Sequence, residues 1–409
     1  MKTIYCFVGM LLSCAAFASA GEDWPQFRGP SQEGKSDASD LPVTWSEAQN
    51  VKWKTAVAGE GWSSPVILGS QIWMTTSTDE GKSLRALCMD RESGKIVHDV
   101  ECFRISELQP KNSFNSYASP TPAIEPGRVY VSYGTYGNAC IDTATGAILW
   151  KNDDLKIDHR EGPGSSPVLY KNLYLLHCDG CDFQYLVALD KQTGKIVWKT
   201  QRSYDFSKVR SDMRKAFSMP LAAAVNGHDQ LLSVGSHRAY GYNPQDGSEL
   251  WHVDLPGFSN VPRPVLVDGV AYISTGYMNP ELWAIKIDGA SPEVIWKAKQ
   301  GTPLKPSVLV MDGLLYMVAD NGIARCLDAK TGAQIWQSRI LSSCSASPIL
   351  ANGLLYFFDE RGKAAVLKPG KTLHVVAENQ LDGRVLASPA VVGKALYVRT
   401  DKALYRIEK

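Results

Sequence analysis

The chain has 409 residues, of which 44% are hydrophobic and 21% are charged, as is ordinary for a globular protein. This length is sufficient for a large core in one or two domains. Lysine and arginine number 43 against 42 acidic residues, so no global charge favours nucleic acid or an anionic membrane surface.

Residues 1–20 predict a signal peptide that is removed on export. Lys2 supplies the positive charge, residues 4–17 are apolar, and residues 18–20 (Ala-Ser-Ala) form a small-residue cleavage site. We therefore expect an exported protein of the periplasm or extracellular space, with outer-membrane association as one option. The alternative is a lipid anchor at Cys14, which ends the stretch "LLSC". No other stretch approaches the roughly 20 apolar residues that a membrane helix needs.

Residues 21–44 predict an N-terminal arm that precedes the main domain. The arm is rich in Gly, Ser and Asp apart from "DWPQFRGP" at residues 23–30. Trp24, Phe27 and Arg28 are expected to dock the arm onto the domain, because two exposed aromatic side chains would otherwise lie in water. The same residues could equally contact a partner.

Two sequence marks recur along residues 45–409. One is Asp-x-x-(Thr/Ser/Asp)-Gly followed by a strand that usually carries Trp, as in "ALDKQTGKIVW" at residues 188–198. The other is a small residue, Pro and an apolar strand, followed by a Tyr-rich strand. It occurs eight times, from "SSPVILGSQIW" at 63–73 to "ASPAVVGKALYV" at 387–398. Each unit reads as four short strands, which is typical of a propeller blade.

The two ends of the chain predict how the ring closes. The last unit stops after three strands, and "VKWKTAV" at residues 51–57 is the missing fourth strand. We therefore predict an all-β, eight-bladed β-propeller of four-stranded blades, in which an N-terminal strand completes the C-terminal blade. The strand tryptophans are assigned to packing between blades; they are Trp53, Trp150, Trp198, Trp251, Trp296 and Trp336.

Long connections between blades predict a binding face. The connections at residues 103–119, 155–165 and 201–218 are long and consecutive, so they must lie side by side on one face. Aromatic and arginine side chains there suit a polar or anionic partner. The alternative is that these loops are solvated and bind nothing. The predicted binding face comprises Arg104, Lys111, Asn112, Phe114, Tyr117, Tyr136, His159, Arg160, Glu161, His177, Asp179, Arg210, Asp212 and Arg214.

Cysteine and histidine patterns give weaker signals. Cys178 and Cys181 form a C-x-x-C motif, which in an exported protein predicts a local disulfide rather than a zinc site or a catalytic thiol pair. Without the predicted signal peptide, seven cysteines remain, and this odd number argues against a full disulfide framework. His159, His177 and His237 could share a metal, but we predict no metal site and no catalytic residue.

Residues 188–198 resemble the pyrroloquinoline-quinone-type repeat, Ala-x-Asp-x-x-Thr-Gly-x-x-x-Trp, and the other copies match it in part. The resemblance implies the blade fold, and two groups of proteins share it. Quinoprotein dehydrogenases carry an adjacent Cys-Cys pair beside the quinone and a calcium site of Glu, Asn and Asp. BamB-like proteins are non-enzymatic and act in bacterial outer-membrane assembly.

This sequence has no Cys-Cys pair and no recognisable calcium set. We therefore expect a BamB-like binding scaffold without a cofactor, whose partner is a protein or envelope polymer and not a nucleic acid. The alternative is a periplasmic quinoprotein dehydrogenase of alcohols or sugars, which would need pyrroloquinoline quinone with calcium.

Overall fold

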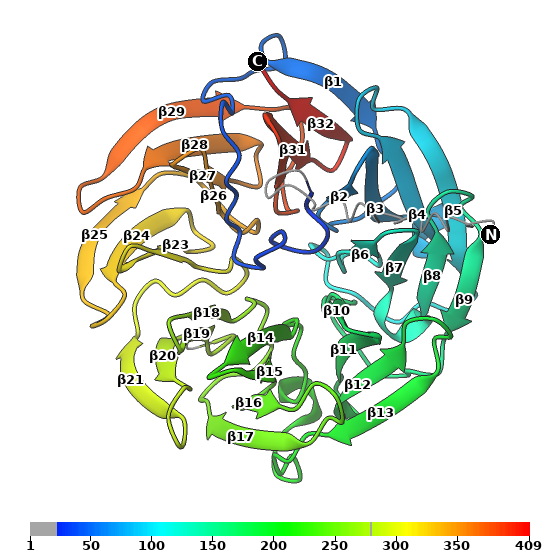
Figure 1. Ribbon diagram of the computed structural model, residues 1–409, viewed down its shortest axis with the longest axis vertical. Helices are drawn as coiled ribbons and strands as arrows, with labels where there is room; N and C mark the ends of the chain where they lie inside the picture. Colours follow the sequence, from blue (N-terminus) through cyan, green and yellow to red (C-terminus); the bar gives the residue numbers. More distant parts are fainter. Residues whose placement is uncertain (1–22, 279) are drawn as a thin grey trace, which may run out of the picture.

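The computed structural model describes residues 23–278 and 280–409, and their strands form eight antiparallel sheets of four strands each. The sheets stand as blades around a central axis (Figure 1). The predicted all-β, eight-bladed propeller is confirmed. The predicted signal peptide and Cys14 lie outside the described residues.

Seven blades consist of four strands that follow one another in the sequence, the first nearest the axis and the fourth outermost (Figure 1). Blades 1 to 3 are β2 (Val66–Leu68), β3 (Gln71–Thr78), β4 (Ser83–Asp90), β5 (Ile96–Arg104); β6 (Ala123–Glu125), β7 (Arg128–Ser132), β8 (Asn138–Asp142), β9 (Ile148–Asn152); and β10 (Val168–Tyr170), β11 (Leu173–Asp179), β12 (Gln184–Asp190), β13 (Ile196–Gln201). Blades 4 and 5 are β14 (Leu221–Val225), β15 (His228–Val234), β16 (Arg238–Tyr242), β17 (Glu249–Asp254); and β18 (Val265–Val267), β19 (Val270–Ser274), β20 (Leu282–Lys286), β21 (Glu293–Ala298). Blades 6 and 7 are β22 (Leu309–Met311), β23 (Leu314–Val318), β24 (Ile323–Asp328), β25 (Gln334–Arg339); and β26 (Ile349–Ala351), β27 (Leu354–Phe358), β28 (Lys363–Lys368), β29 (His374–Gln380).

Blade 8 joins the two ends of the chain. Its strands are β30 (Ala390–Val392), β31 (Ala395–Arg399), β32 (Ala403–Ile407) and, outermost, β1 (Val51–Ala56). β1 pairs antiparallel with β32, from Val51 opposite Ile407 to Ala56 opposite Ala403. The predicted closure is confirmed, and backbone hydrogen bonds hold the first and last parts of the chain in one sheet.

The tryptophan of an outer strand packs on the Asp-x-x-x-Gly turn of the next blade. A Cβ added to Gly194 of blade 3 would lie 2.5 Å from Cε3 of Trp150 of blade 2, so only glycine allows this contact. Trp150 also donates its indole N–H to the carbonyl oxygen of Lys191 at 2.8 Å. The same contact joins Trp53 to Gly94, Trp198 to Gly247 and Trp296 to Gly332. Trp251 differs, since its indole bonds within its own blade, to Gln230.

The N-terminal arm crosses the central channel of the ring (Figure 1). Trp24 exchanges two backbone hydrogen bonds with Ile67 of blade 1, at 2.7 and 2.8 Å. Arg28 is buried and donates from Nη2 to the carbonyl oxygen of Val308, next to blade 6, at 2.7 Å. The docking predicted for Trp24, Phe27 and Arg28 is confirmed.

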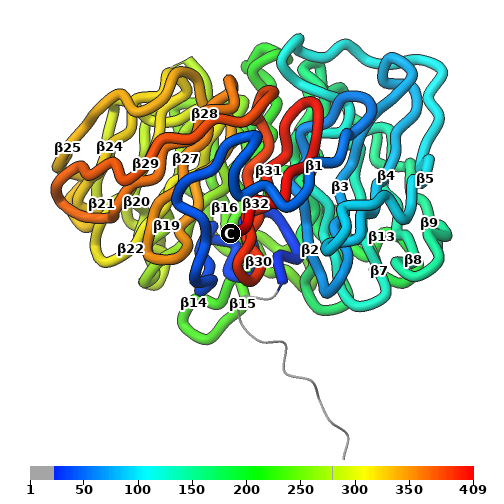
Figure 2. The backbone as a smooth tube through the Cα atoms, turned by 90° about the horizontal axis from the view of Figure 1, so that it is seen from above, coloured from blue at the N-terminus to red at the C-terminus, as the bar shows by residue number. Residues whose placement is uncertain are grey.

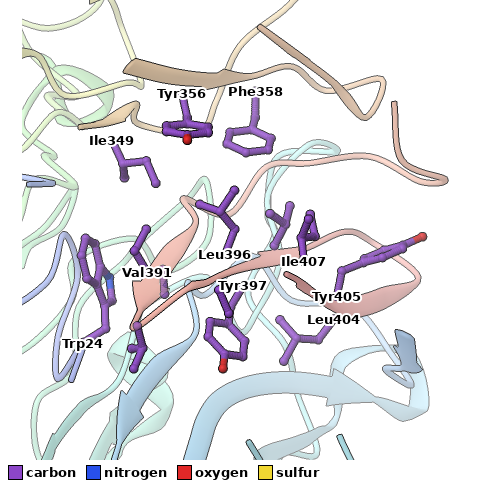
Figure 3. Close-up of a cluster of buried hydrophobic side chains, with 14 of the residues drawn as sticks. Trp24, Ile349, Tyr356, Phe358, Val391, Leu396, Tyr397, Leu404, Tyr405 and Ile407 are labelled. Atoms are coloured by element: carbon purple, nitrogen blue, oxygen red, sulfur yellow. The ribbon is translucent and has the colours of Figure 1, made fainter. Parts of the chain in front are cut away.

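The arm then follows blade 7 to reach β1. Ser36 donates its backbone N–H to Leu350, and Leu350 donates to Gly34. The largest apolar cluster lies here, among blades 7, 8 and 1 and the arm. In Figure 3 Trp24 lies beside Val391 at one end of this cluster. The arm is therefore part of the core, and its polar composition did not reveal this.

The remaining elements of the described residues are short. Three single-turn 3-10 helices are present, η1 (Asp79–Gly81), η2 (Gly134–Tyr136) and η3 (Ser211–Met213). In the described part of the chain no helix has the length and hydropathy needed to cross a membrane. The segments after β5 and β13 project on the same side of the ring (Figure 2).

Candidate binding pocket

A pocket of about 780 Å³ opens at the axis of the ring, on the face that carries the long loops. Its floor consists of residues that immediately precede the innermost strands, together with Phe27 of the arm. Its walls come from the loops between blades. Because the arm occupies the channel beneath, Phe27 forms part of the bottom of this depression.

The floor is built from small hydroxyl side chains that link neighbouring blades. In five cases the backbone N–H of the residue two positions before an innermost strand donates to the hydroxyl oxygen of the corresponding residue in the next blade. These bonds run from Ser64 to Thr121 (3.0 Å), Thr121 to Ser166 (2.9 Å), Arg263 to Ser307 (3.0 Å), Ser307 to Ser347 (2.9 Å) and Ser347 to Ser388 (2.8 Å). In blades 4 and 5 the corresponding residues, Met219 and Arg263, have no hydroxyl group, and the series is interrupted there. The small residue before each Pro therefore has a role beyond opening a strand.

The rim of the pocket is apolar and exposed. Phe114 from the loop after β5 is 51% exposed, and Tyr277 and Met278 from the loop after β19 are 54% and 68% exposed. Trp62 donates its indole N–H to the carbonyl oxygen of Phe114 at 2.9 Å, which fixes one side of the rim. Aromatic side chains gathered around a concave surface are typical of protein-binding sites.

The charged residues that line the pocket balance each other in number. The cations are Arg160, Lys215 and Lys305, and the anions are Glu161, Asp212 and Asp320. Lys305 lies 3.5 Å from Asp320 and 3.0 Å from Glu360. Lys215 lies 3.8 Å from Glu161. The charged side chains are therefore largely engaged with one another.

Five of the predicted binding residues line this pocket: Asn112, Phe114, Arg160, Glu161 and Asp212. They come from all three predicted long loops, so these loops do meet at one site. Lys111 lies behind the lining and forms an ion pair with Glu60 at 3.1 Å.

Three predicted residues do not line the pocket and are engaged by neighbouring groups of the protein. Arg104 pairs with Asp79, Arg210 pairs with Asp212 at 2.8 Å, and Arg214 donates to the carbonyl oxygen of Val209.

The other five predicted residues are buried inside the walls. Tyr117 and Tyr136 pack edge to face at 5.8 Å, and Tyr136 accepts the backbone N–H of Gln109 through its hydroxyl oxygen. His159 accepts the backbone N–H of Thr135 at Nε2, at 2.9 Å. Burial lowers the pKa of His159 to about 4, so this imidazole is neutral. These side chains hold the loops in place and are not available to a partner.

His177 and Asp179, at the end of β11, are also structural. Burial lowers the pKa of His177 well below its ordinary value, and the ring lies 2.7 Å from the carbonyl oxygen of Ser218 and 2.8 Å from Oγ of Ser233. Asp179 accepts two hydrogen bonds from the guanidinium of Arg202, at 3.0 and 2.6 Å, with both side chains buried. Their assignment to a binding face is therefore wrong, because the loop after β13 covers them.

The disulfide considered for Cys178 and Cys181 is not formed, and both are buried free thiols. Cys178 packs in the apolar cluster between blades 2 and 3. The backbone N–H of Cys181 is bound to the carbonyl oxygen of Asp158 in a neighbouring loop. Burial raises the pKa of Cys178 to about 12 and raises that of Cys181 as well, so neither is a reactive thiolate.

Sequence reasoning missed much of the lining. Residues such as Tyr277 and Met278 lie in a short loop, which gave no length signal. The floor hydroxyls were visible as the small residue before Pro in the second sequence mark, but only their role in starting a strand was inferred.

The side chains of the pocket do not supply the calcium site that the alternative function needs. A calcium site needs several oxygen ligands that converge, and the described residues contain no cluster of three or more His, Cys, Asp and Glu able to hold a metal. The lining contains no cysteine. His159, His177 and His237 likewise do not form a metal cluster within the described range.

The fold, the repeats and the axial pocket define the chain as an eight-bladed propeller of the pyrroloquinoline-quinone-like class. A family model described as outer membrane protein assembly factor BamB matches residues 88–338 and 283–408. The chain belongs to this family.

Individual relatives agree with this assignment. The chain is similar to outer membrane protein assembly factor BamB of Yersinia pestis (28% identity; 44% of this chain, 48% of the relative) and of Legionella pneumophila (26%; 59% and 49%). It thus spans about half the length of these curated relatives.

Solved structures share the fold at low identity. BamB from Moraxella catarrhalis superposes with a TM-score of 0.61 at 12% identity, covering 87% of this chain and 99% of that chain. A europium-containing methanol dehydrogenase superposes with a TM-score of 0.71 at 13% identity, covering 92% and 89%. These likenesses establish the propeller and do not separate a binding protein from an enzyme.

Proposed function

We propose that this chain is an exported, non-enzymatic scaffold protein that binds a protein partner through the axial pocket and its apolar rim. The observation that carries the proposal is the exposure of Phe114, Tyr277 and Met278 around a pocket of about 780 Å³. Large exposed apolar side chains are costly unless a partner covers them, and aromatic anchors at the centre of an interface supply much of its binding energy.

Family membership supports a partner in the bacterial envelope. The relatives are named as assembly factors for outer membrane proteins. The predicted signal peptide would deliver this chain to the same compartment. An envelope protein is therefore the proposed partner class.

The test is capture of envelope proteins by the purified mature chain, compared with a variant that lacks the rim anchors. Phe114→Ala with Tyr277→Ala should reduce capture at least tenfold, because two anchors are lost from the proposed interface. Ile295→Ala is the matched control, since Ile295 on β21 is 45% exposed and does not line the pocket. Equal capture by the rim variant and the control would refute the proposal.

A separate titration addresses the enzyme alternative. We expect no calcium-dependent binding of pyrroloquinoline quinone by calorimetry. Saturable, calcium-dependent binding near one equivalent would overturn the scaffold function and would justify a screen of alcohols and sugars.

A further inference from the structure

The floor of the pocket carries hydroxyl donors without protein acceptors. Thr121, Ser166, Ser307, Ser347 and Ser388 each accept a backbone N–H through the hydroxyl oxygen. Within the described residues none of these five hydroxyl groups donates to a protein acceptor, so each O–H proton is free. All five line the pocket, and they are only 1% to 6% exposed. Because the pocket is open, these five hydroxyl protons can be donated to a ligand that enters it.

Three buried arginines lie around this floor. Arg28 donates to the carbonyl oxygen of Val308, Arg263 donates to that of Phe27, and Arg399 donates to that of Ser63, all next to or within the floor. In the part of the chain that is described, none of the three forms an ion pair with a carboxylate. The charge of Glu33 acts on Arg28, but the carboxylate of Glu33 forms its ion pair with Lys35, at 2.5 Å.

No carboxylate within the described residues forms an ion pair with these arginines, and only the charge of Arg28 is partly offset, by Glu33. Nε and Nη1 of Arg28 and the Nε atoms of Arg263 and Arg399 are buried without hydrogen-bond partners. Burial lowers the pKa of each of the three guanidinium groups to about 9, which leaves them charged at neutral pH. Since the cations and anions of the lining balance, the buried arginines decide the sign of the potential at the floor, and charges act strongly in a low-dielectric interior.

We propose that the floor of the pocket is a carboxylate receptor, in which the free hydroxyl donors bind an Asp, Glu or C-terminal carboxylate of the partner that docks on the rim. This inference rests on the proposed function and names the chemistry of its partner. Carboxylate is favoured over phosphate because two of the three cations of the lining, Lys215 and Lys305, which would help to clamp a phosphate, are already paired with acids.

The test is calorimetric titration of the mature chain with succinate, with neutral succinamide as the matched probe. Succinate should bind saturably with a dissociation constant in the millimolar range, whereas succinamide should bind at least tenfold more weakly. Equal binding of the two probes, or no succinate binding, would overturn the receptor. Tighter binding of inorganic phosphate than of succinate would overturn the choice of carboxylate.

Variants locate the site. Ser347→Ala should weaken succinate binding at least fivefold, because one free donor is removed. Ser345→Ala is the control, since Ser345 also lines the pocket but already donates its proton to Glu360. If Ser347→Ala does not fold, Arg263→Met is used instead, because it removes one of the buried positive charges. An unchanged affinity of Arg263→Met for succinate would contradict the proposal.

Competition separates this inference from the proposed function. Succinate that displaces the captured partner supports both. Capture that depends on the rim anchors but is insensitive to succinate would leave the scaffold function standing and refute the carboxylate receptor.

Discussion

Replacing Gly194 with alanine should destabilise the seam between blades 2 and 3 more than the same replacement at Gly313. The two glycines have nearly the same backbone angle, φ +71° and +72°. At Gly313 an added Cβ would meet no atom within 4 Å, whereas at Gly194 it would lie 2.5 Å from Cε3 and 2.7 Å from Cδ2 of Trp150. The comparison therefore isolates the packing contact from the backbone conformation.

The magnitude follows from the two contributions. Placing a Cβ in the left-handed region costs about 1–2 kcal/mol at either position. Overpacking of a filled site costs a further 1–3 kcal/mol or so, and only Gly194 incurs it. Gly194→Ala should thus lose about 2–5 kcal/mol of unfolding free energy, against about 1–2 kcal/mol for Gly313→Ala.

Urea unfolding followed by far-ultraviolet circular dichroism measures both variants under the same conditions. In a Trp150→Leu background the difference between the two alanine variants should shrink, because the clashing ring is gone. If Gly194→Ala is no more destabilising than Gly313→Ala in the wild-type background, the tryptophan-on-turn contact does not hold the blades together.

Two further predictions concern buried polar groups. Asp179→Ala should cost about 3–5 kcal/mol of unfolding free energy, because it leaves the Arg202 charge buried without its partner. Arg210→Ala, which removes an exposed ion pair, should cost under about 1 kcal/mol. Similar losses of the two variants in urea unfolding would contradict this prediction. His159 and His177 stay neutral in the folded protein, whereas the unfolded chain binds protons near pH 6.5. The free energy of unfolding should therefore have its full value above that pH, and it should fall by about 2 kcal/mol per histidine between pH 6.5 and pH 5. A thermal midpoint that does not change across this range would rule out the assignment.

Much of the fold could be predicted from the sequence because its signals are local. An Asp-x-x-Thr-Gly turn forms from its own atoms, as when Oδ1 of Asp190 accepts the backbone N–H and the hydroxyl of Thr193, both at 2.9 Å. The other mark, a small residue and Pro before an apolar strand, occurs eight times and determines the number of blades, and a missing strand at one end requires its counterpart at the other. The long loops likewise indicated the face on which the pocket opens.

The lining of the pocket depended on tertiary structure. His177 and Asp179 had the residue types of a binding site, but partners from blade 4 and the loop after β13 enclose them. Tyr277 and Met278 became rim residues only because the closed ring brings their short loop to the axis. Repeats and turns are determined by atoms a few residues apart, whereas burial and pairing of a polar side chain depend on contacts between blades that are distant in the sequence.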